Sequence, residues 1–392
     1  MTDIAVHSEA EAVDAVLAAC EWKSPLNIVG ARTKRALGRA AAQWGTALDL
    51  SGLRGVIAYE PEELVLTVLP GTPVAEIRAL LAAKNQRLGF DPPDWGPLLG
   101  AHANAGTIGG AVAADANGPA RVRYGAVRDH LLGFRAVNGL GEAYKAGGRV
   151  VKNVTGFDLP KLMCGAFGTL GPLTEVTLRV FPRPPLSATL AVRGAEDGLA
   201  LLRRVWSGPL EATGLAYVPA GSAVAELDGA DTALIRLEGA REPLQEKIAA
   251  LRTWLAKSDV REVPESDALW RKLGDGAPLA DTVLDVWRVA VPPAGAASCA
   301  AEIASPSWYA DWAGGMLWIG IDPENVEAPG KLRAVAAKAG GHATLMRANA
   351  QKRAQIPVFQ PEPPARAALT RAVKAAFDPL GLFNPGRMFE GA

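Results

Sequence analysis

The stretch Ala105-Gly106-Thr107-Ile108-Gly109-Gly110-Ala111 carries three glycines within five residues. It lies in a longer region, residues 96–125, in which glycine and alanine dominate and apolar periodicity fades. Such a region is either a flexible linker or backbone that must pass close to something flat. Glycine has no Cβ, so its backbone can approach a planar ring, and Thr107 adds a hydroxyl. The segments around this stretch have to supply the framework that holds it.

Short apolar runs on both sides of the glycine-rich stretch are typical of strands. The expected strands are residues 26–29, 47–50, 64–69, 131–137 and 174–181. A first helix is expected after Ser8, which forms a capping-box pattern with Glu11. A second helix is expected with Thr72 as its N-cap and Pro73 at its first position. The Pro-Arg-Pro-Pro run at residues 182–185 is predicted to be a stiff linker that ends the first domain.

The second half of the chain has a different pattern. Residues 188–255 are predicted to form a strand, a helix, three short strands within residues 214–237 and a second helix. The pattern then roughly repeats over residues 283–346, and the whole reads as strand–helix–strand–strand–helix–strand. This order is that of the ferredoxin-like arrangement, an antiparallel sheet with helices on one face. A last helix is expected near residues 365–377. The sequence therefore predicts an α+β fold with domains at residues 1–183 and 184–348, followed by a C-terminal tail at residues 349–392.

Composition excludes several classes of protein. Lys and Arg number 41 and Asp and Glu also number 41 among 392 residues, so the basic excess of a nucleic-acid binder is missing. The three scattered cysteines form no C-x-x-C pair, which argues against a disulfide framework, an iron–sulfur cluster or a Cys-type zinc site. There is no apolar run of about eighteen residues and no signal-peptide pattern. A cytoplasmic location is expected, with any membrane association supplied by partners.

Gly30-Ala31-Arg32-Thr33-Lys34 directly follows a predicted strand. Successive backbone N–H groups of a small-residue turn, together with a hydroxyl and a cation, suit the oxygens of a diphosphate. An ordinary turn with solvated basic residues is the simpler interpretation of this segment alone. The segment is neither a Walker A loop nor a G-x-G-x-x-G dinucleotide fingerprint.

Two further polar segments follow the glycine-rich stretch. Tyr124-Gly125-Ala126-Val127-Arg128-Asp129 ends in two charged residues that more often form a structural pair than a catalytic one. Residues 151–159 interleave polar side chains with glycine and apolar residues, which is typical of the wall of a half-buried ligand site. A polar loop followed by the Gly-rich turn at residues 168–171 explains the second segment equally well.

Taken together and in order, these segments resemble the FAD-linked oxidase family named after vanillyl-alcohol oxidase and p-cresol methylhydroxylase (PCMH). The matching segments are residues 59–65, 69–73, 106–110, Gly125 with Arg128-Asp129, 168–171 and 377–388. Within the family, residues 117–121 and 152–159 are most similar to the FAD-binding subunits of bacterial glycolate oxidases. The resemblance implies a two-lobed PCMH-type FAD-binding domain, a ferredoxin-like cap domain over the flavin, and a tail that returns to the FAD domain.

The resemblance also implies a cofactor and partners. FAD would be bound non-covalently, because neither His102 nor His130 stands at a recognised position for covalent attachment. The implied FAD-binding residues are Gly30, Ala31, Arg32, Thr33, Lys34, Gly71, Thr72, Gly106, Thr107, Ile108, Gly109, Gly110, Gly118, Arg121, Gly125, Arg128, Asp129, Lys152, Asn153, Thr155, Gly156, Asp158 and Asn384. The implied partners are a homologous FAD-containing catalytic subunit and an iron–sulfur subunit, with a glycolate-like small acid as substrate.

The resemblance departs from the family pattern in the second half, where only His342 follows residue 130. Relatives that oxidise 2-hydroxy acids usually carry a His-rich metal site there, so no metal site is expected in this chain. His342 and Arg347 are weak catalytic candidates, because both lie near the end of one predicted strand. The simpler interpretation is that His342 is a histidine at the sheet edge and Arg347 a solvated arginine. Besides an electron-transferring subunit, a self-sufficient oxidase and an assembly subunit with a degenerate flavin site stay open.

Overall fold

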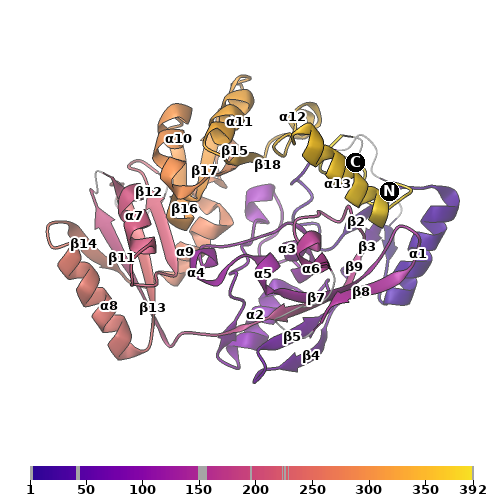
Figure 1. The fold of residues 1–392 in the computed structure, drawn as a ribbon, viewed down its shortest axis with the longest axis horizontal. Helices are drawn as coiled ribbons and strands as arrows, with labels where there is room; N and C mark the ends of the chain where they lie inside the picture. The colour runs from indigo at the N-terminus through magenta and orange to yellow at the C-terminus, as the bar shows by residue number, and fades with distance from the viewer. Residues whose placement is uncertain are drawn as a thin grey trace. The chain divides into compact units, whose positions relative to one another are not determined.

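The computed structural model describes residues 3–40, 45–148, 157–194, 197–222, 224, 227 and 229–390. The chain forms two compact units, whose elements are labelled in Figure 1. Unit 1 consists of Met1–Ala116, Ala126–Pro182 and Asn349–Ala392, and unit 2 of Asn117–Gly125 and Arg183–Ala348. The sequence-based domain limits placed residues 117–125 in the first domain, whereas the structure groups this short segment with unit 2.

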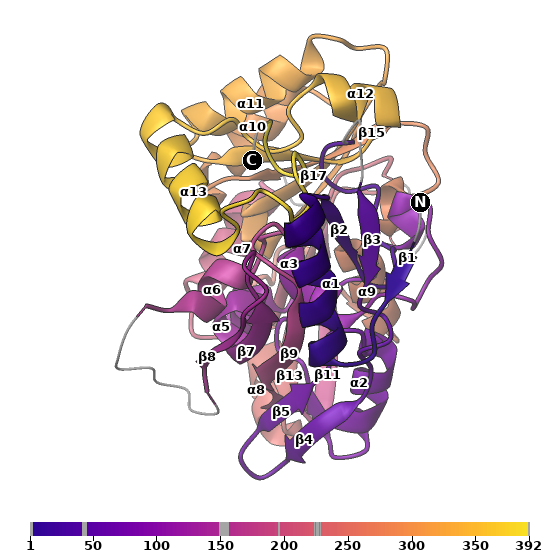
Figure 2. The same cartoon turned by 90° about the vertical axis from the view of Figure 1, so that its right-hand side faces the viewer.

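The smaller lobe of unit 1 is a three-stranded parallel sheet covered by one helix. Its strands, in sheet order, are β1 (Asp3–Ala5), β3 (Thr46–Asp49) and β2 (Leu26–Val29). Helix α1 (Glu9–Trp22) lies beside this sheet and buries Ala12, Val16 and Ala19 in their shared core (Figure 2). Ser8 caps this helix as the sequence predicts, because its hydroxyl accepts a hydrogen bond from the Glu11 N–H at 3.2 Å.

The larger lobe of unit 1 is a five-stranded antiparallel sheet packed against short helices. Its strands, in sheet order, are β4 (Val56–Glu60), β5 (Val65–Val68), β9 (Leu173–Arg179), β7 (Leu131–Val137) and β8 (Ala143–Gly147). The helices that share its core are α2 (Val74–Ala82), α3 (Ile108–Ala113), α5 (Val127–His130) and α6 (Leu159–Met163). A two-stranded pair, β6 (Gln86–Arg87) with β10 (Phe181–Pro182), closes the lobe. Ile77, Ile108 and Val176 are fully buried in this core, so burial of apolar side chains holds α3 in place.

The turn before α2 differs from the expectation. Helix α2 begins at Val74, so Pro73 occupies the N-cap position and Thr72 makes no cap. The Thr72 hydroxyl instead accepts from the Gly55 N–H at 2.9 Å and donates to the Leu69 carbonyl at 2.7 Å. The hydroxyl is already engaged in the preceding loop, and the side chain is therefore structural in unit 1.

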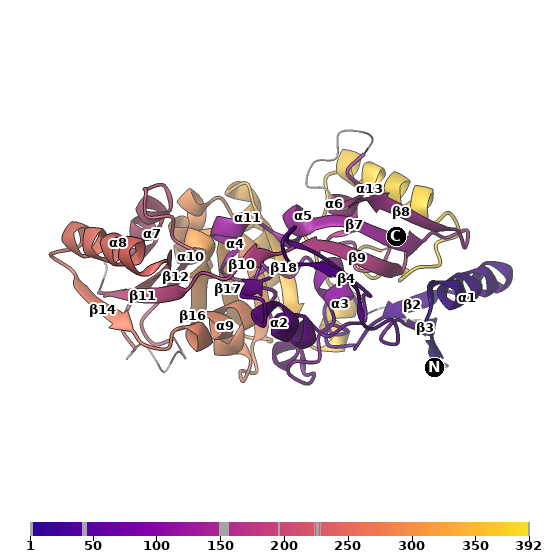
Figure 3. The same cartoon turned by 90° about the horizontal axis from the view of Figure 1, so that it is seen from below.

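Unit 2 is an eight-stranded antiparallel sheet made of two ferredoxin-like repeats. The first repeat is β11 (Leu186–Arg193), α7 (Gly198–Trp206), β12 (Gly214–Val218), β13 (Thr232–Gly239), α8 (Arg241–Trp254) and β14 (Asp259–Val263). The second repeat is β15 (Asp285–Ala290), α10 (Ala296–Ile303), β16 (Ser307–Asp311), β17 (Met316–Ile321), α11 (Ala328–Lys338) and β18 (His342–Arg347). The sheet order is β14-β11-β13-β12-β16-β17-β15-β18, so the repeats join through their second strands. Figure 3 shows α7, α8, α10 and α11 along one side of this sheet. The predicted α+β class is confirmed.

Two elements of unit 2 were not expected from the sequence. Strand β14 lies at an edge of the sheet and exposes three of its five residues, so it has no apolar signal. Helix α9 (Asp267–Asp275) lies between the repeats. Its Trp270 donates an indole N–H to the Thr189 hydroxyl at 2.8 Å, on the side of β11 opposite to Leu190 and the α7–α8 core. Helix α9 therefore covers the second face of the sheet.

The C-terminal segment of unit 1 contains α12 (Ala350–Gln355), α13 (Pro364–Phe377) and an extended tail. Within it, the Lys374 ammonium donates to the carbonyl oxygens of Thr169 and Phe383 and to the Asp378 carboxylate. Asp378 is fully buried and also accepts the N–H groups of Leu382 and Phe383. In the described part of the chain, no helix is long and apolar enough to cross a bilayer.

Candidate functional site

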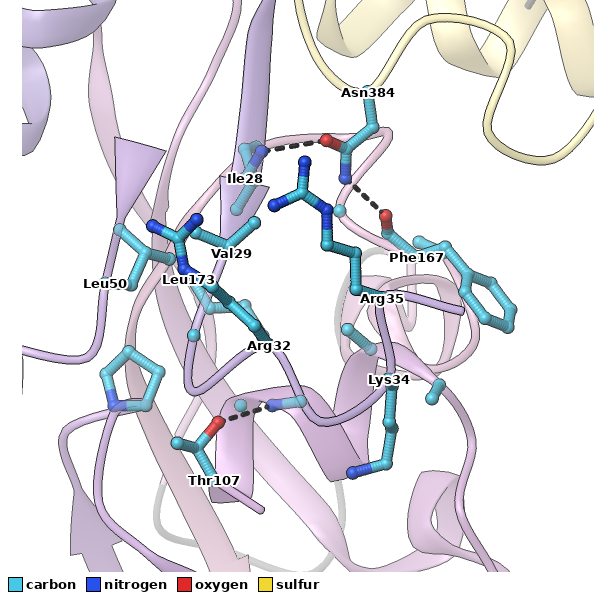
Figure 4. A pocket seen from close by; sticks show the side chains of 18 of the residues that line it. Ile28, Val29, Arg32, Lys34, Arg35, Leu50, Thr107, Phe167, Leu173 and Asn384 are labelled. Atoms are coloured by element: carbon cyan, nitrogen blue, oxygen red, sulfur yellow. Dashed lines mark hydrogen bonds between the residues drawn. The ribbon is translucent and has the colours of Figure 1, made fainter. Parts of the chain in front are cut away.

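Unit 1 contains a cavity with about 940 Å³ of empty space, part of it open to solvent. Most of its wall comes from four separate segments, within residues 27–35, 107–114, 163–173 and 384–387, and Leu50 and Pro70 add to it (Figure 4). These segments come from β2 and its following loop, from α3, from the loop before β9 and from the C-terminal tail.

The loop after β2, Gly30 to Lys34, lines the cavity and is called the amide loop below. Arg32 has a left-handed φ of 60°, a conformation that occurs in anion-binding nests of successive amides. Among the described residues, no backbone carbonyl accepts the N–H groups of residues 31–34. A Cβ on Gly30 would lie 2.9 Å from the Thr107 Oγ1, so only glycine lets this loop pass so close to α3. The loop can therefore hold an anionic group between itself and the start of α3.

The glycines of the Gly106–Gly110 stretch set the position of α3. The Thr107 hydroxyl caps the helix by accepting from the Gly110 N–H at 3.2 Å (Figure 4). A Cβ on Gly109 would lie 2.6 Å from the Cβ of Pro70, closer than packed atoms allow. The absence of side chains at these positions thus brings α3 against Pro70 and leaves its cavity side flat.

Lys34 is one of the cations in the cavity wall. Its ammonium lies 3.5 Å from the point where a Cβ on Gly106 would stand and 4.0 Å from that of Gly110. Desolvation of this ammonium lowers the pKa of Lys34 to about 8, and the negative charge of Asp94 opposes the shift. The ammonium is therefore mostly protonated near neutral pH, and an anion bound beside it would restore part of the solvation it has lost.

The C-terminal tail completes the wall. Asn384 bridges two segments, because its Oδ1 accepts the Ile28 N–H at 2.8 Å and its Nδ2 donates to the Phe167 carbonyl at 2.7 Å (Figure 4). The Arg387 guanidinium donates to the carbonyl oxygen of Lys34 at 2.9 Å. These bonds hold β2, the loop before β9 and the amide loop in one arrangement.

Positive charge accumulates beside the amide loop. Burial lowers the pKa of Arg387 to about 10, with further lowering by the nearby charges of Arg353 and Arg35. Arg353 donates to the Gly38 carbonyl at 3.0 Å and is itself buried. Guanidinium groups gathered in this way make this side of the cavity attractive to an anion.

The cavity fits a dinucleotide such as FAD. The amide loop and Lys34 offer the N–H donors and the cation that a diphosphate requires. Apolar residues such as Val29, Met163 and Leu173 offer flat contacts for a ring.

Part of the predicted cofactor-binding set lines this cavity. These residues are Gly30, Ala31, Arg32, Thr33, Lys34, Thr107, Gly109, Gly110 and Asn384. Gly71, Thr72, Gly106 and Ile108 adjoin the wall in sequence without lining the cavity, and Gly118, Arg121 and Gly125 belong to unit 2. Lys152, Asn153, Thr155 and Gly156 lie outside the described residues. Their contact with a cofactor stays a prediction.

Two predicted residues, Asp129 and Asp158, make structural contacts within unit 1. The Asp129 carboxylate accepts the Ala126 N–H at 2.8 Å at the start of α5, next to Arg128. Asp158 precedes α6 and forms an exposed ion pair with Lys161 at 2.9 Å. These contacts explain the charged residues without a ligand.

Sequence reasoning missed several wall residues. Asn27, Arg35, Phe167 and Arg387 line the cavity but were not among the predicted site residues. Phe167 directly precedes the recognised Gly168–Gly171 turn, and Arg387 lies in the recognised tail, so both motifs pointed to them. Asn27 belongs to no motif, and its only signal is that it is a polar residue within an apolar strand.

The weak catalytic candidates are not brought together. His342 and Arg347 stand at opposite ends of β18, and the expectation that both lie near one strand end is wrong. The Arg347 guanidinium donates to the carbonyl oxygens of Ala280, Thr282 and Leu284, so it is a structural group of unit 2. Within the described residues, no group of His, Cys, Asp or Glu could hold a metal ion.

Comparisons with known proteins agree with this geometry. A family model described as "FAD binding domain" matches residues 3–147. The chain is 33% identical over 373 residues to glycolate oxidase subunit GlcE of Escherichia coli, covering 94% of this chain and 93% of that protein. It is 30% identical over 179 residues to glycolate oxidase subunit GlcD of Bacillus subtilis, covering 45% of this chain and 36% of that one. The fold is similar to that of p-cresol methylhydroxylase with substrate bound, with a TM-score of 0.71 and 16% identity over 98% of this chain and 88% of that chain.

Proposed function

This chain belongs to the FAD-linked oxidase family and binds FAD, and we propose that it is the FAD-binding subunit of a glycolate oxidase complex that oxidises a 2-hydroxy acid to the 2-oxo acid. One observation carries the proposal. The similarity to a glycolate oxidase subunit extends over 94% of the chain and so is not confined to the FAD domain. A similarity confined to the FAD domain would support the binding of FAD but not the membership of a glycolate oxidase complex.

The residues of unit 1 bind and orient the cofactor. The Gly30–Lys34 loop and the Lys34 ammonium would hold the diphosphate, and Asn384 and Arg387 would keep this loop in its binding conformation. FAD, when bound, accepts two electrons from the substrate or from another carrier. We propose that the attachment is non-covalent. His130 lies between the rings of Phe90 and Phe181, at centroid distances of 5.4 and 5.1 Å, which suits a packing role.

Electrons must leave this chain through a partner. The three cysteines are far apart in the sequence, and no C-x-x-C pair is present to hold an iron–sulfur cluster. We therefore propose two partners, a homologous FAD-containing catalytic subunit and an iron–sulfur subunit. The complex would be cytoplasmic, and any contact with the inner membrane would come from the partners.

A second candidate function is that of an assembly subunit without redox turnover. Two observations favour it over a self-sufficient oxidase. Arg347 is engaged by backbone carbonyls, and the described residues hold no metal-binding group of the type that would activate a hydroxy acid. Neither observation concerns the residues of the FAD cavity, so this chain can bind FAD without oxidising a substrate.

The test begins with the full-length chain purified alone and loaded with FAD. Acid treatment should release the flavin, because no covalent bond holds it. Anaerobic glycolate should leave the absorbance of this flavin unchanged, and addition of the homologous FAD-containing subunit with glycolate should bleach it. Bleaching by glycolate without a partner would contradict the subunit proposal and indicate a self-sufficient oxidase.

The flavin of this chain must be distinguished from that of its partner. A Lys34→Glu variant places a carboxylate beside the diphosphate and should assemble into a complex with one flavin fewer per catalytic subunit. If that complex oxidises glycolate at the wild-type rate, the redox role is refuted and the assembly function holds. A folded wild-type chain that takes up no FAD would refute the electron-transfer role as well.

A further inference from the structure

Asn27 is a buried polar residue that the FAD site described so far does not use. It lies on β2 three residues before Gly30, is 3% exposed and lines the cavity of unit 1. Its side-chain amide nitrogen is buried and finds no hydrogen-bond acceptor in the protein. An amide buried without a partner costs folding free energy, and native proteins rarely keep one without a reason.

The surroundings of Asn27 indicate an uncharged ligand group. The cations that line the cavity come from the amide loop (Arg32 and Lys34), from the residue that follows it (Arg35) and from the tail beside it (Arg387). Asn27 instead lies on the strand, on the same face as Val29, because side chains alternate along β2. A diphosphate is therefore held by the loop, and a neutral group reaches the strand.

The spacing along β2 matches a nucleoside. A strand rises about 3.3 Å per residue, so Asn27 lies about 10 Å from Gly30 along the strand. A base attached through a ribose to the diphosphate in the loop extends over a comparable length. The carbonyl of an asparagine side chain can accept and its amide can donate, side by side, which complements the N6–H donor and the N7 acceptor of adenine.

We propose that Asn27 recognises the adenine base of the bound dinucleotide and makes this cavity specific for adenine over other purines. Guanine and hypoxanthine present two acceptors at the same edge, so the Asn27 carbonyl would face an acceptor and lose its partner. The inference rests on the assignment of the cavity to FAD and adds the residue that selects the nucleotide.

The test uses the full-length chain stripped of its flavin, with ADP and IDP as probes in calorimetric titrations. The wild-type protein should bind ADP about tenfold more tightly than IDP, the factor expected when one good base contact is lost. Asn27→Leu should bind both nucleotides equally and at about the IDP level. Equal binding of ADP and IDP by the wild-type chain overturns the proposal. A preference for ADP over 2′-deoxy-ADP that is present in the wild type and lost in Asn27→Leu also overturns it.

A stability measurement separates recognition from a structural role. The empty Asn27→Leu protein should melt at a higher temperature than the wild type, because the unpaired amide is gone. A lower melting temperature with unchanged nucleotide discrimination would mean that Asn27 is structural, and the proposal would fall. If the wild-type chain binds neither ADP nor FAD, the FAD assignment fails together with this inference. If it binds FAD but binds ADP and IDP equally well, only the inference fails.

Thr67 offers a matched control on another strand of unit 1. It is also 3% exposed, but its hydroxyl is hydrogen-bonded to the Thr177 hydroxyl at 3.1 Å and lies outside the cavity wall. Thr67→Val should lower the melting temperature and leave the ratio of ADP to IDP affinity unchanged. A change in that ratio would show that substitution of a buried polar residue can alter nucleotide selection indirectly. The effect of Asn27→Leu would then no longer support a contact between Asn27 and the base.

Discussion

The affinity of the chain for FAD should fall steeply as the pH rises through 8, because Lys34 loses its proton there. Burial holds the pKa of the free Lys34 ammonium at about 8 instead of 10.5. A diphosphate beside the ammonium stabilises its charged form, so in the complex this pKa lies higher. Binding above pH 8 therefore requires the uptake of a proton, which weakens the apparent affinity.

The magnitude follows from the fraction of Lys34 that is protonated. With a pKa of about 8, roughly ten elevenths of the free protein carries the charge at pH 7 and roughly one eleventh at pH 9. The apparent Kd for FAD should therefore rise about tenfold between these two pH values, equivalent to ~1.4 kcal/mol. Arg387, whose pKa is about 10, stays protonated over this range and does not contribute.

Fluorescence titrations of the flavin-free chain with FAD measure this dependence, with two variants as controls. Lys34→Arg keeps the charge at every pH used, so its Kd should be nearly independent of pH. Lys34→Gln should bind FAD at pH 7 about as weakly as the wild type does at pH 9, again without a slope. A tenfold slope that persists in Lys34→Gln would refute the assignment, because another group would then be titrating.

The stability of the empty protein should change in the opposite direction. The folded-state pKa of Lys34 lies below its unfolded value, so the unfolded chain holds this proton more tightly. The destabilisation by Lys34 is fully present below about pH 8 and is relieved as the pH rises from about 8 towards 10.5. Urea unfolding of wild type and Lys34→Gln over this range should show this gain in the wild type alone.

Three further substitutions test the framework of the cavity. Arg387→Gln removes a charged donor from the amide loop, worth ~1.5–3 kcal/mol, and should weaken FAD binding about tenfold or more in the same titration; unchanged affinity would show that the loop holds its shape alone. Asp378→Asn leaves the buried Lys374 ammonium without a counter-charge and should lower the free energy of unfolding in urea by ~3–5 kcal/mol, whereas a loss below ~1 kcal/mol would contradict the pairing argument. Gly109→Ala would place a Cβ 2.6 Å from Pro70 and should cost ~1–3 kcal/mol in thermal unfolding; a variant as stable as the wild type would show that α3 can move away.

The elements with local signals were predicted well from the sequence. The apolar run of β2, the Ser8 cap of α1 and the repeated pattern of unit 2 all depend on residues that are neighbours in the chain. The Gly30–Lys34 loop, which lines the cavity, was found for the same reason, because its signal is a run of consecutive residues. These features need no knowledge of distant contacts.

The segment 117–125 could not be placed from its own sequence. Its backbone is held in unit 2 by a residue almost two hundred positions later, since the Trp312 indole N–H donates to the Gly118 carbonyl at 3.0 Å. The Arg121 guanidinium also lies 4.3 Å from the centroid of the Trp312 ring. Small residues such as Gly118 give no indication of which distant side chain will pack on them.

The same limit applies to the wall of the FAD cavity. Arg387 acts on the amide loop through the backbone carbonyl of Lys34, and no sequence pattern announces a contact with a carbonyl. Strand β14 was missed because an exposed edge strand has no apolar alternation. Long-range hydrogen bonds and exposed edges are the two features that local patterns do not encode.

The division of unit 1 along the chain has a consequence for biosynthesis. Residues 27–35 leave the ribosome early, whereas Asn384 and Arg387 follow only after all of unit 2 has been made. Since domains fold as units during synthesis, unit 2 can fold while the cofactor cavity is still missing one wall. FAD should therefore be loaded after translation, and a cell short of FAD should accumulate complete chains with an open cavity rather than truncated ones.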